Sequence, residues 1–186
     1  MAIVANVKKV LFQRRLLREI QRRKPDYQPR VVNPDTAKTI AILFPADSVD
    51  DRKTVEAYRQ ARKQSGLRTE LLGYFTKHVG NSSFGFDHFS NKDLNWYGIP
   101  GGERVEKFLE RPCDLLMCLG NAGHKQLDFL ASLKDAGLRV GPYSEAPDNP
   151  YDVLFSIEGI AKDLGEQLKQ IDRIFKVTNA TSPALV

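Results

Sequence analysis

Two continuous apolar runs constrain the fold of this 186-residue chain more than any other feature. Residues 39–44 read Thr-Ile-Ala-Ile-Leu-Phe, and residues 113–119 read Cys-Asp-Leu-Leu-Met-Cys-Leu. Apolar runs of this kind, without polar alternation, are typical of strands buried on both faces of a parallel sheet. Because parallel strands need crossover connections, which are usually helical, we expect strands and helices to alternate along the chain.

The remaining segments follow that alternation. We expect strands at 39–44, 67–75, 113–119, 138–141 and 152–156, and helices over about 48–65, 103–110, 121–135 and 160–177. The connection over 76–102 holds five glycines and is long for a compact domain, which is typical of a functional or mobile loop. The prediction is a three-layer, doubly wound α/β fold with a mostly parallel five-stranded sheet, Rossmann-like or flavodoxin-like.

The chain divides into four parts. Residues 1–24 lack Gly and Pro and predict a basic amphipathic N-terminal helix, which Pro25 ends. Residues 25–37, with two further prolines, predict an extended linker. Residues 38–177 form the single α/β domain, and residues 178–186 are expected to be a flexible tail.

Positive charge is concentrated at the N-terminus. Residues 1–30 contain nine basic and two acidic residues, a net charge of +7, whereas the rest of the chain has a net charge of −2. Such asymmetry indicates an acidic partner, either structured RNA such as ribosomal RNA or an anionic membrane surface. The candidate RNA-binding residues are Lys8, Lys9, Arg14, Arg15, Arg18, Arg22, Arg23 and Lys24.

The pattern of the N-terminal helix favours RNA over a membrane. Arg14, Arg18 and Arg22 recur every four residues, while Leu16, Leu17 and Ile20 lie on the opposite side. That apolar face is short and lacks Trp, which is unlike a helix that inserts into a membrane surface. A third reading is that the helix packs on the domain, or on a second copy, through Val4, Val7 and Leu11.

Composition excludes several classes. No apolar run approaches the roughly 20 residues that a membrane-spanning helix needs. Lys8 and Lys9 interrupt the N-terminal apolar residues before a secretory segment can form, so we expect a cytoplasmic protein. Cys113 and Cys118 are expected to be buried free thiols, and together with three scattered histidines they give no zinc-ligand spacing. We predict no metal and no cofactor.

A ligand crevice is expected beyond the carboxyl ends of the two most apolar strands, which should be the central pair of the sheet. The loops there hold Asp47 and Ser48 after the first strand, and Asn121 and His124 after the second. His124 is a candidate acid or base, and the helix N-termini suit a phosphate. Ordinary helix caps, or a magnesium site using Asp47 and its acidic neighbours, are the alternatives. The chain has no G-x-G-x-x-G, Walker or G-x-S-x-G motif.

The long loop carries a second group of candidates. Lys92, Asp93, Asn95 and Trp96 combine the aromatic and polar side chains that a ligand-binding or base-stacking lid uses. The alternative is a structured loop that Trp96 and Phe89 pin onto the domain. Together with the crevice residues, these side chains suggest an alternative function: a small enzyme or sensor that binds a phosphorylated or nucleotide-like ligand. The first hypothesis is a non-enzymatic protein that binds RNA.

Four short motifs carry a family resemblance. They are Phe89-x-x-Lys-Asp-Leu-Asn-Trp-x-Gly98, Pro112-x-Asp-Leu-Leu, Arg139-Val-Gly141 and Tyr151-Asp152. Over residues 38–175 the chain resembles a bacterial α/β family of unknown function that includes a basic N-terminal helix. This resemblance implies the fold and a bacterial cytoplasmic origin, but no activity.

A second resemblance rests on the apolar run from Cys113, the helix after it, and the segment from Ala136 to Gly141. These residues are similar to the acceptor-side Rossmann-like domain of lipopolysaccharide heptosyltransferases. A complete transferase of that kind is not expected, because its second, nucleotide-sugar-binding domain has no room in 186 residues.

Overall fold

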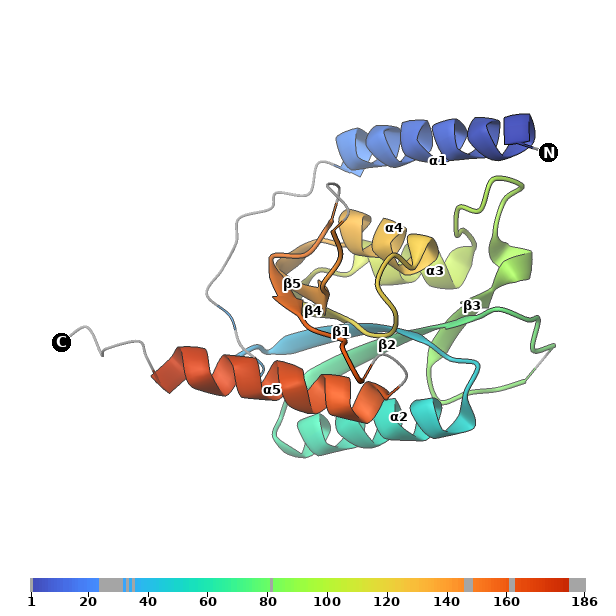
Figure 1. Cartoon of the computed structure of the whole chain (residues 1–186). Helices are drawn as coiled ribbons and strands as arrows, with labels where there is room; N and C mark the ends of the chain where they lie inside the picture. The colour runs from blue at the N-terminus through green and yellow to red at the C-terminus, as the bar shows by residue number, and fades with distance from the viewer. Residues whose placement is uncertain are drawn as a thin grey trace.

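One six-stranded sheet organises the molecule, with the strands in the order β3-β2-β1-β4-β5-β6 and every neighbouring pair parallel (Figure 1). This computed structural model describes residues 2–23, 32, 34, 36–80, 82–145, 149–160 and 163–180. The strands are β1 (Thr39–Pro45), β2 (Arg68–Phe75), β3 (Asp87–Ser90), β4 (Cys113–Cys118), β5 (Ala136–Pro142) and β6 (Val153–Phe155).

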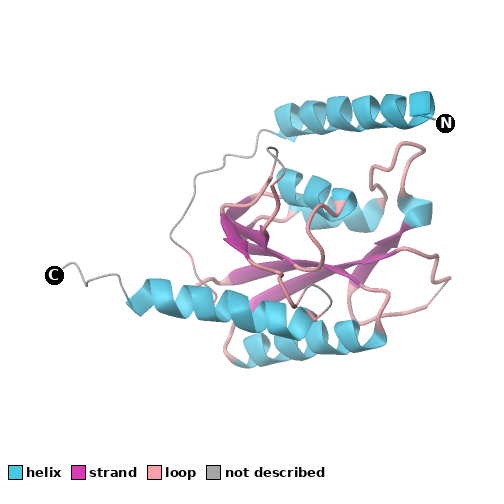
Figure 2. Cartoon of the chain, in the orientation of Figure 1, coloured by secondary structure: helices cyan, strands magenta, loops and turns pink. Residues whose placement is uncertain are grey.

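Helices cover both faces of the sheet (Figures 1 and 2). The helices are α1 (Ala2–Arg23), α2 (Val49–Gln64), α3 (Glu103–Glu110), α4 (Lys125–Leu133) and α5 (Leu164–Ala180), with a 3₁₀ turn, η1, at Asn91–Asp93. Helices α2 and α5 lie on one face and α3 and α4 on the other, while α1 lies outside α4 as an additional layer. The predicted three-layer α/β fold is therefore confirmed.

The strand order reverses between β1 and β4, as in the doubly wound Rossmann arrangement. The two strands pair directly, from Ile40 opposite Leu115 to Leu43 opposite Cys118. The two apolar runs are thus the central pair, as predicted. Their carboxyl ends lead into the loops before α2 and α4, where a doubly wound sheet has its natural binding crevice.

Strand β1 is buried on both faces, which explains its unbroken apolar sequence. Ile40, Ile42 and Phe44 point into the core beneath α2 and α5, whereas Ala41 and Leu43 point into the core beneath α3 and α4. All five are almost fully buried. A strand with two buried faces has no position for a polar side chain.

The prediction of five strands is wrong, because β3 forms a sixth at one edge of the sheet. Only Phe89 in this four-residue strand is a buried apolar residue, so no apolar run marks it. Its pairing with β2, from Leu72 opposite Asp87 to Phe75 opposite Ser90, defines the strand instead. The predicted connection over 76–102 is therefore shorter and partly structured.

Three other boundaries differ from the prediction. Ala136 and Gly137, expected to end a helix, begin β5, where Ala136 pairs with Cys113. Helix α4 begins only at Lys125, and α5 begins at Leu164 after a turn that contains Ile160. Apolar spacing does not distinguish a short helix followed by a strand from one longer helix. Helix α5 continues to Ala180, so residues 178–180 of the predicted tail over 178–186 are helical, and the rest of the tail and most of the linker lie outside the described residues.

The two cysteines are free thiols in β4, Cys118 buried and Cys113 partly so. Burial raises the pKa of Cys113 to about 12 and that of Cys118 further still. Since only the thiolate is an effective nucleophile, we expect neither thiol of the folded protein to be alkylated appreciably by iodoacetamide near pH 8, as read by intact mass. In denaturant both thiols should react, and rapid labelling of the folded protein would contradict this assignment.

Candidate functional site

Helix α1 docks on α4 through an apolar stripe. Phe12, Leu16 and Ile20 recur one turn apart and pack against the core that α4 covers. The Phe12 ring meets the Phe129 ring edge-on, with 5.4 Å between the ring centroids. The helix therefore does pack on the domain, but not through the face expected in the third reading, since Val4 remains 58% exposed.

Docking by that stripe turns the predicted basic face outward. Arg14, Arg15, Arg18 and Arg22 are exposed, on the side of α1 away from α4. Glu19 lies at the edge of the docked face, only 6% exposed. It binds Arg15 at 2.6 Å and Arg22 at 2.7 Å, and so orders two of the arginines while leaving the helix strongly positive.

The other candidate RNA-binding residues are placed differently. Lys8 and Lys9 are exposed on the first half of α1, at the side nearer the domain. The side chain of Arg23, and Lys24 altogether, lie outside the described part of the chain. We define the arginine row as Arg14, Arg18 and Arg22, which follow one another at intervals of four residues along the outer face of α1.

At the strand-end crevice, Asp47 and Ser48 hold the backbone in place. The Asp47 carboxylate accepts hydrogen bonds from the Thr76 backbone N–H at 3.0 Å and the Thr76 hydroxyl at 2.8 Å, which ties the loop after β1 to the end of β2. The Ser48 hydroxyl accepts from the Asp51 N–H at 3.2 Å and caps α2. Ser48 is thus a helix cap, as that alternative predicts, whereas Asp47 caps no helix and instead joins two loops.

His124 lies on the opposite side of the crevice, at the start of α4. Its ring meets the Tyr74 ring edge-on at 5.0 Å, and the Tyr74 hydroxyl donates to Asn91. The His124 Nδ1 atom is buried and has no hydrogen-bond partner among the described residues. Asn121, on the same loop, is exposed. The structure therefore brings Asp47 and His124 together near Tyr74, at the expected end of the sheet.

Burial lowers the pKa of His124, and Asp47 opposes this shift only weakly. The unfolded chain therefore binds the proton more readily than the folded protein, so the folded state loses stability as the pH falls below the ordinary His value of 6.5. We expect His124→Asn to reduce this loss, measured as the free energy of unfolding in urea at about pH 7.5 and about pH 5.5. The matched variant His78→Asn, at an exposed histidine, should retain the wild-type pH dependence. Identical pH profiles for His124→Asn and the wild type would contradict the assignment.

The loop after β3 is ordered by the side chains that were candidates for a ligand. The Asp93 carboxylate accepts from the Ser90 N–H at 2.7 Å, and the Asn95 side-chain oxygen accepts from the Ile99 N–H at 3.0 Å. Phe89 pins the loop to the core, as the structured-loop alternative predicts, but Trp96 is 61% exposed. Lys92 is also exposed. The loop therefore holds Trp96 out into solvent, edge-on to Tyr97 with 5.2 Å between the ring centroids.

A cleft of about 860 Å³ lies between α1 and the domain, and the sequence analysis did not predict it. We call it the α1 cleft. It is bounded by α1, by α4 and by the segment before β6. Tyr97 also lines it, from the loop after β3 that carries Trp96, which we call the aromatic loop. Lys8 and Lys9 were singled out for their charge, and Tyr151 only as part of a family motif. Phe129 carried no visible signal, because only the docking of α1 brings it opposite the lysines.

Within the described ranges, no group of three or more His, Cys, Asp or Glu side chains is arranged to hold a metal ion, which gives the magnesium alternative at Asp47 no support. The described part of the chain also contains no helix both long and apolar enough to cross a membrane.

Fold and surface together define an α/β protein with Rossmann strand order, an accessory basic helix and an aromatic loop beside it. Residues 8–177 match a family of unknown function, DUF6913, and the chain belongs to that family. The match includes most of α1 as well as the whole sheet. No curated protein matches the chain.

Proposed function

We propose that this protein binds structured RNA through the outer face of α1, with the α/β domain as a platform that holds the helix. One observation carries the proposal. Helix α1 uses Phe12, Leu16 and Ile20 to dock on α4, so the arginine row faces solvent on a helix that is fixed to a folded domain. A preorganised row of cations loses less conformational entropy on binding than a free basic arm does.

The spacing and chemistry of the arginine row suit a phosphate backbone. Arg14 and Arg22 are eight residues apart, which places them about 12 Å apart along the helix axis. Guanidinium groups form paired hydrogen bonds to phosphate oxygens. The chain beyond residue 30 has a net charge of −2, so the N-terminal segment supplies the positive charge for the encounter.

An anionic membrane surface is the second candidate partner. Val4, Val7, Val10 and Leu17 of α1 are exposed, and basic helices with exposed apolar residues bind such surfaces. The stripe of Phe12, Leu16 and Ile20, however, is buried on α4. A helix lying in a membrane interface needs its apolar stripe free, which favours RNA.

Binding measurements on the full chain separate the two partners. We expect a fluorescently labelled RNA hairpin to bind, with affinity that falls steeply with salt. For four phosphate contacts, the slope of log K against log[salt] should be roughly −3 to −4. Phosphatidylserine vesicles should retain little protein in flotation. Vesicle binding without RNA binding would replace this proposal with the membrane candidate, and binding to neither would overturn both.

A further inference from the structure

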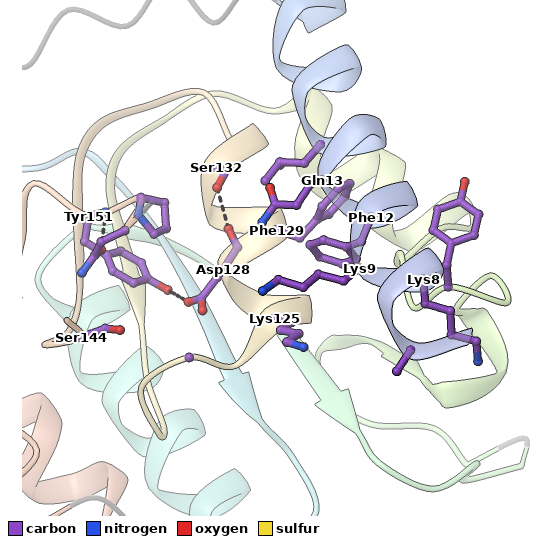
Figure 3. A pocket seen from close by; sticks show the side chains of 16 residues that line it. Lys8, Lys9, Phe12, Gln13, Lys125, Asp128, Phe129, Ser132, Ser144 and Tyr151 are labelled. Atoms are coloured by element: carbon purple, nitrogen blue, oxygen red, sulfur yellow. Dashed lines mark hydrogen bonds between the residues drawn. The ribbon is translucent and has the colours of Figure 1, made fainter. Parts of the chain in front are cut away.

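The α1 cleft combines an apolar wall with lysine side chains, and the Asp128 carboxylate also lines it. Phe12 of α1 and Phe129 of α4 line it, with the Tyr151 ring on its inner side (Figure 3). The side chains of Lys9 and Lys125 extend into the same space between the two helices. Neither lysine forms an ion pair within the described part of the chain. The cleft therefore suits a ligand with a flat apolar part and a negative charge.

Its inner wall is rigid. The Tyr151 hydroxyl donates to the Asp128 carboxylate at 2.6 Å. The ring of Tyr151 packs directly on Gly141, where a Cβ atom would lie only 2.5 Å from the ring. A ring held by its hydroxyl at one end and by close packing on its face is a preformed surface for another ring.

Polar groups also line this wall, which argues against a purely apolar ligand. The Asn149 side-chain nitrogen is buried and donates to no acceptor among the described residues. Ser132 of α4 also lines the cleft, and its hydroxyl already donates to the Asp128 backbone oxygen at 2.8 Å. An acyl chain would leave the Asn149 nitrogen unsatisfied, whereas a nucleobase has acceptors on its edge.

We propose that the α1 cleft binds one unstacked nucleotide, with its base against the Tyr151 ring and its phosphate between Lys9 and Lys125. This inference rests on the proposed function and extends it, because the arginine row lies on the other side of the same helix. A volume of about 860 Å³ is ample for one nucleotide. Tyr97, at the outer end of the cleft, and the exposed Trp96 beside it offer a further stacking surface for a neighbouring base.

Nucleotide titration of the full chain tests the cleft directly. We expect adenosine and uridine 5′-monophosphate to bind with a Kd of about 0.1–1 mM, measured by calorimetry. Ribose 5-phosphate, which lacks a base, should bind at least about tenfold more weakly. The double variant Lys9→Gln, Lys125→Gln should weaken nucleotide binding about tenfold.

A variant whose cleft is blocked by a large side chain, compared with a matched control variant, tests where the nucleotide binds. Ala5 lines the cleft from an exposed position on α1, so Ala5→Trp should block nucleotide binding without disturbing the core. Asn6, the exposed neighbour, does not line the cleft, and Asn6→Trp should bind nucleotides as the wild type does. With a single-stranded oligouridine, Ala5→Trp should bind about tenfold more weakly than Asn6→Trp, because it loses the stacking of one base in the cleft. Binding should not be lost completely, because the arginine row remains intact.

The outcomes separate this inference from the proposed function. Nucleotide binding that Ala5→Trp abolishes and Asn6→Trp retains supports the cleft. A chain that binds the RNA hairpin but no nucleotide, or binds decanoate in the cleft in preference to nucleotides, overturns the inference and leaves the proposed function standing. Nucleotide binding by a chain that binds no RNA overturns the proposed function and with it the assignment of the cleft to RNA.

Discussion

Replacing Arg14, Arg18 and Arg22 together with glutamine is expected to weaken RNA binding roughly 100-fold at low salt. Each substitution removes one phosphate contact, so the slope of log K against log[salt] should become shallower by about 2 to 3. Glutamine has nearly the helix propensity of arginine, and Glu19 keeps Arg15 as its partner at 2.6 Å. Helix α1 should therefore stay folded and docked, which circular dichroism and thermal unfolding check.

A charge-matched variant separates specific contacts from net charge. Lys53 and Lys63 on α2 and Lys176 on α5 are exposed on the opposite side of the sheet from α1. Their replacement by glutamine changes the net charge by the same amount and should reduce affinity only a few-fold. Equal weakening by the two triple variants would mean that the arginine row has no particular role.

The second large effect is on stability, at Gln167. This α5 side chain is fully buried at the end of β4. Its oxygen accepts from the Gly120 N–H at 2.8 Å, and its nitrogen donates to the Ile160 carbonyl at 3.2 Å. Gln167→Leu keeps a similar side-chain volume but removes the partner of the Gly120 N–H and of the Gly120 carbonyl, which accepts from the Gln167 nitrogen at 3.4 Å, whereas the Ile160 carbonyl keeps its bond from the Asp163 N–H at 3.0 Å. We expect a loss of about 2–5 kcal/mol in the free energy of unfolding, measured in urea.

Gln170, one turn further along α5, provides the control. Its side-chain oxygen is buried without a hydrogen-bond partner among the described residues. Gln170→Leu therefore removes a group that already bears a desolvation cost, and should be neutral or slightly stabilising. If Gln170→Leu lowered the free energy of unfolding as much as Gln167→Leu, the helix would tolerate leucine poorly at both positions. The hydrogen bonds of Gln167 would then no longer explain its loss of stability.

Sequence reasoning succeeded where one kind of residue dominates a segment. The unbroken apolar runs identified β1 and β4 as the central strands, because a strand covered on both faces admits no polar side chain. The same reasoning missed β3, an edge strand in which Phe89 alone is a buried apolar residue. It also assigned Ala136 to a helix end, although the residue is buried in β5.

The candidate site was predictable only in part. The positive charge of α1 is a local property and was visible in the sequence, as were the exposed Trp96 and its polar neighbours. Packing of α1 on the domain was one of the alternatives, but the face by which it docks was not predicted, although Phe12, Leu16 and Ile20 share one side of the helix. The α1 cleft depends on contacts between residues more than 100 positions apart, such as Phe12 and Phe129, which no local pattern reports.

Recovery of RNA with the full chain tests the central claim most directly. The tagged protein would be purified at low salt from cells that naturally produce it, beside the Arg14→Gln, Arg18→Gln, Arg22→Gln variant, and the bound RNA sequenced. We predict that structured RNA accompanies the wild type, is released as salt rises, and is strongly depleted with the variant. An absence of RNA from the wild type, or equal recovery with both proteins, would contradict the account.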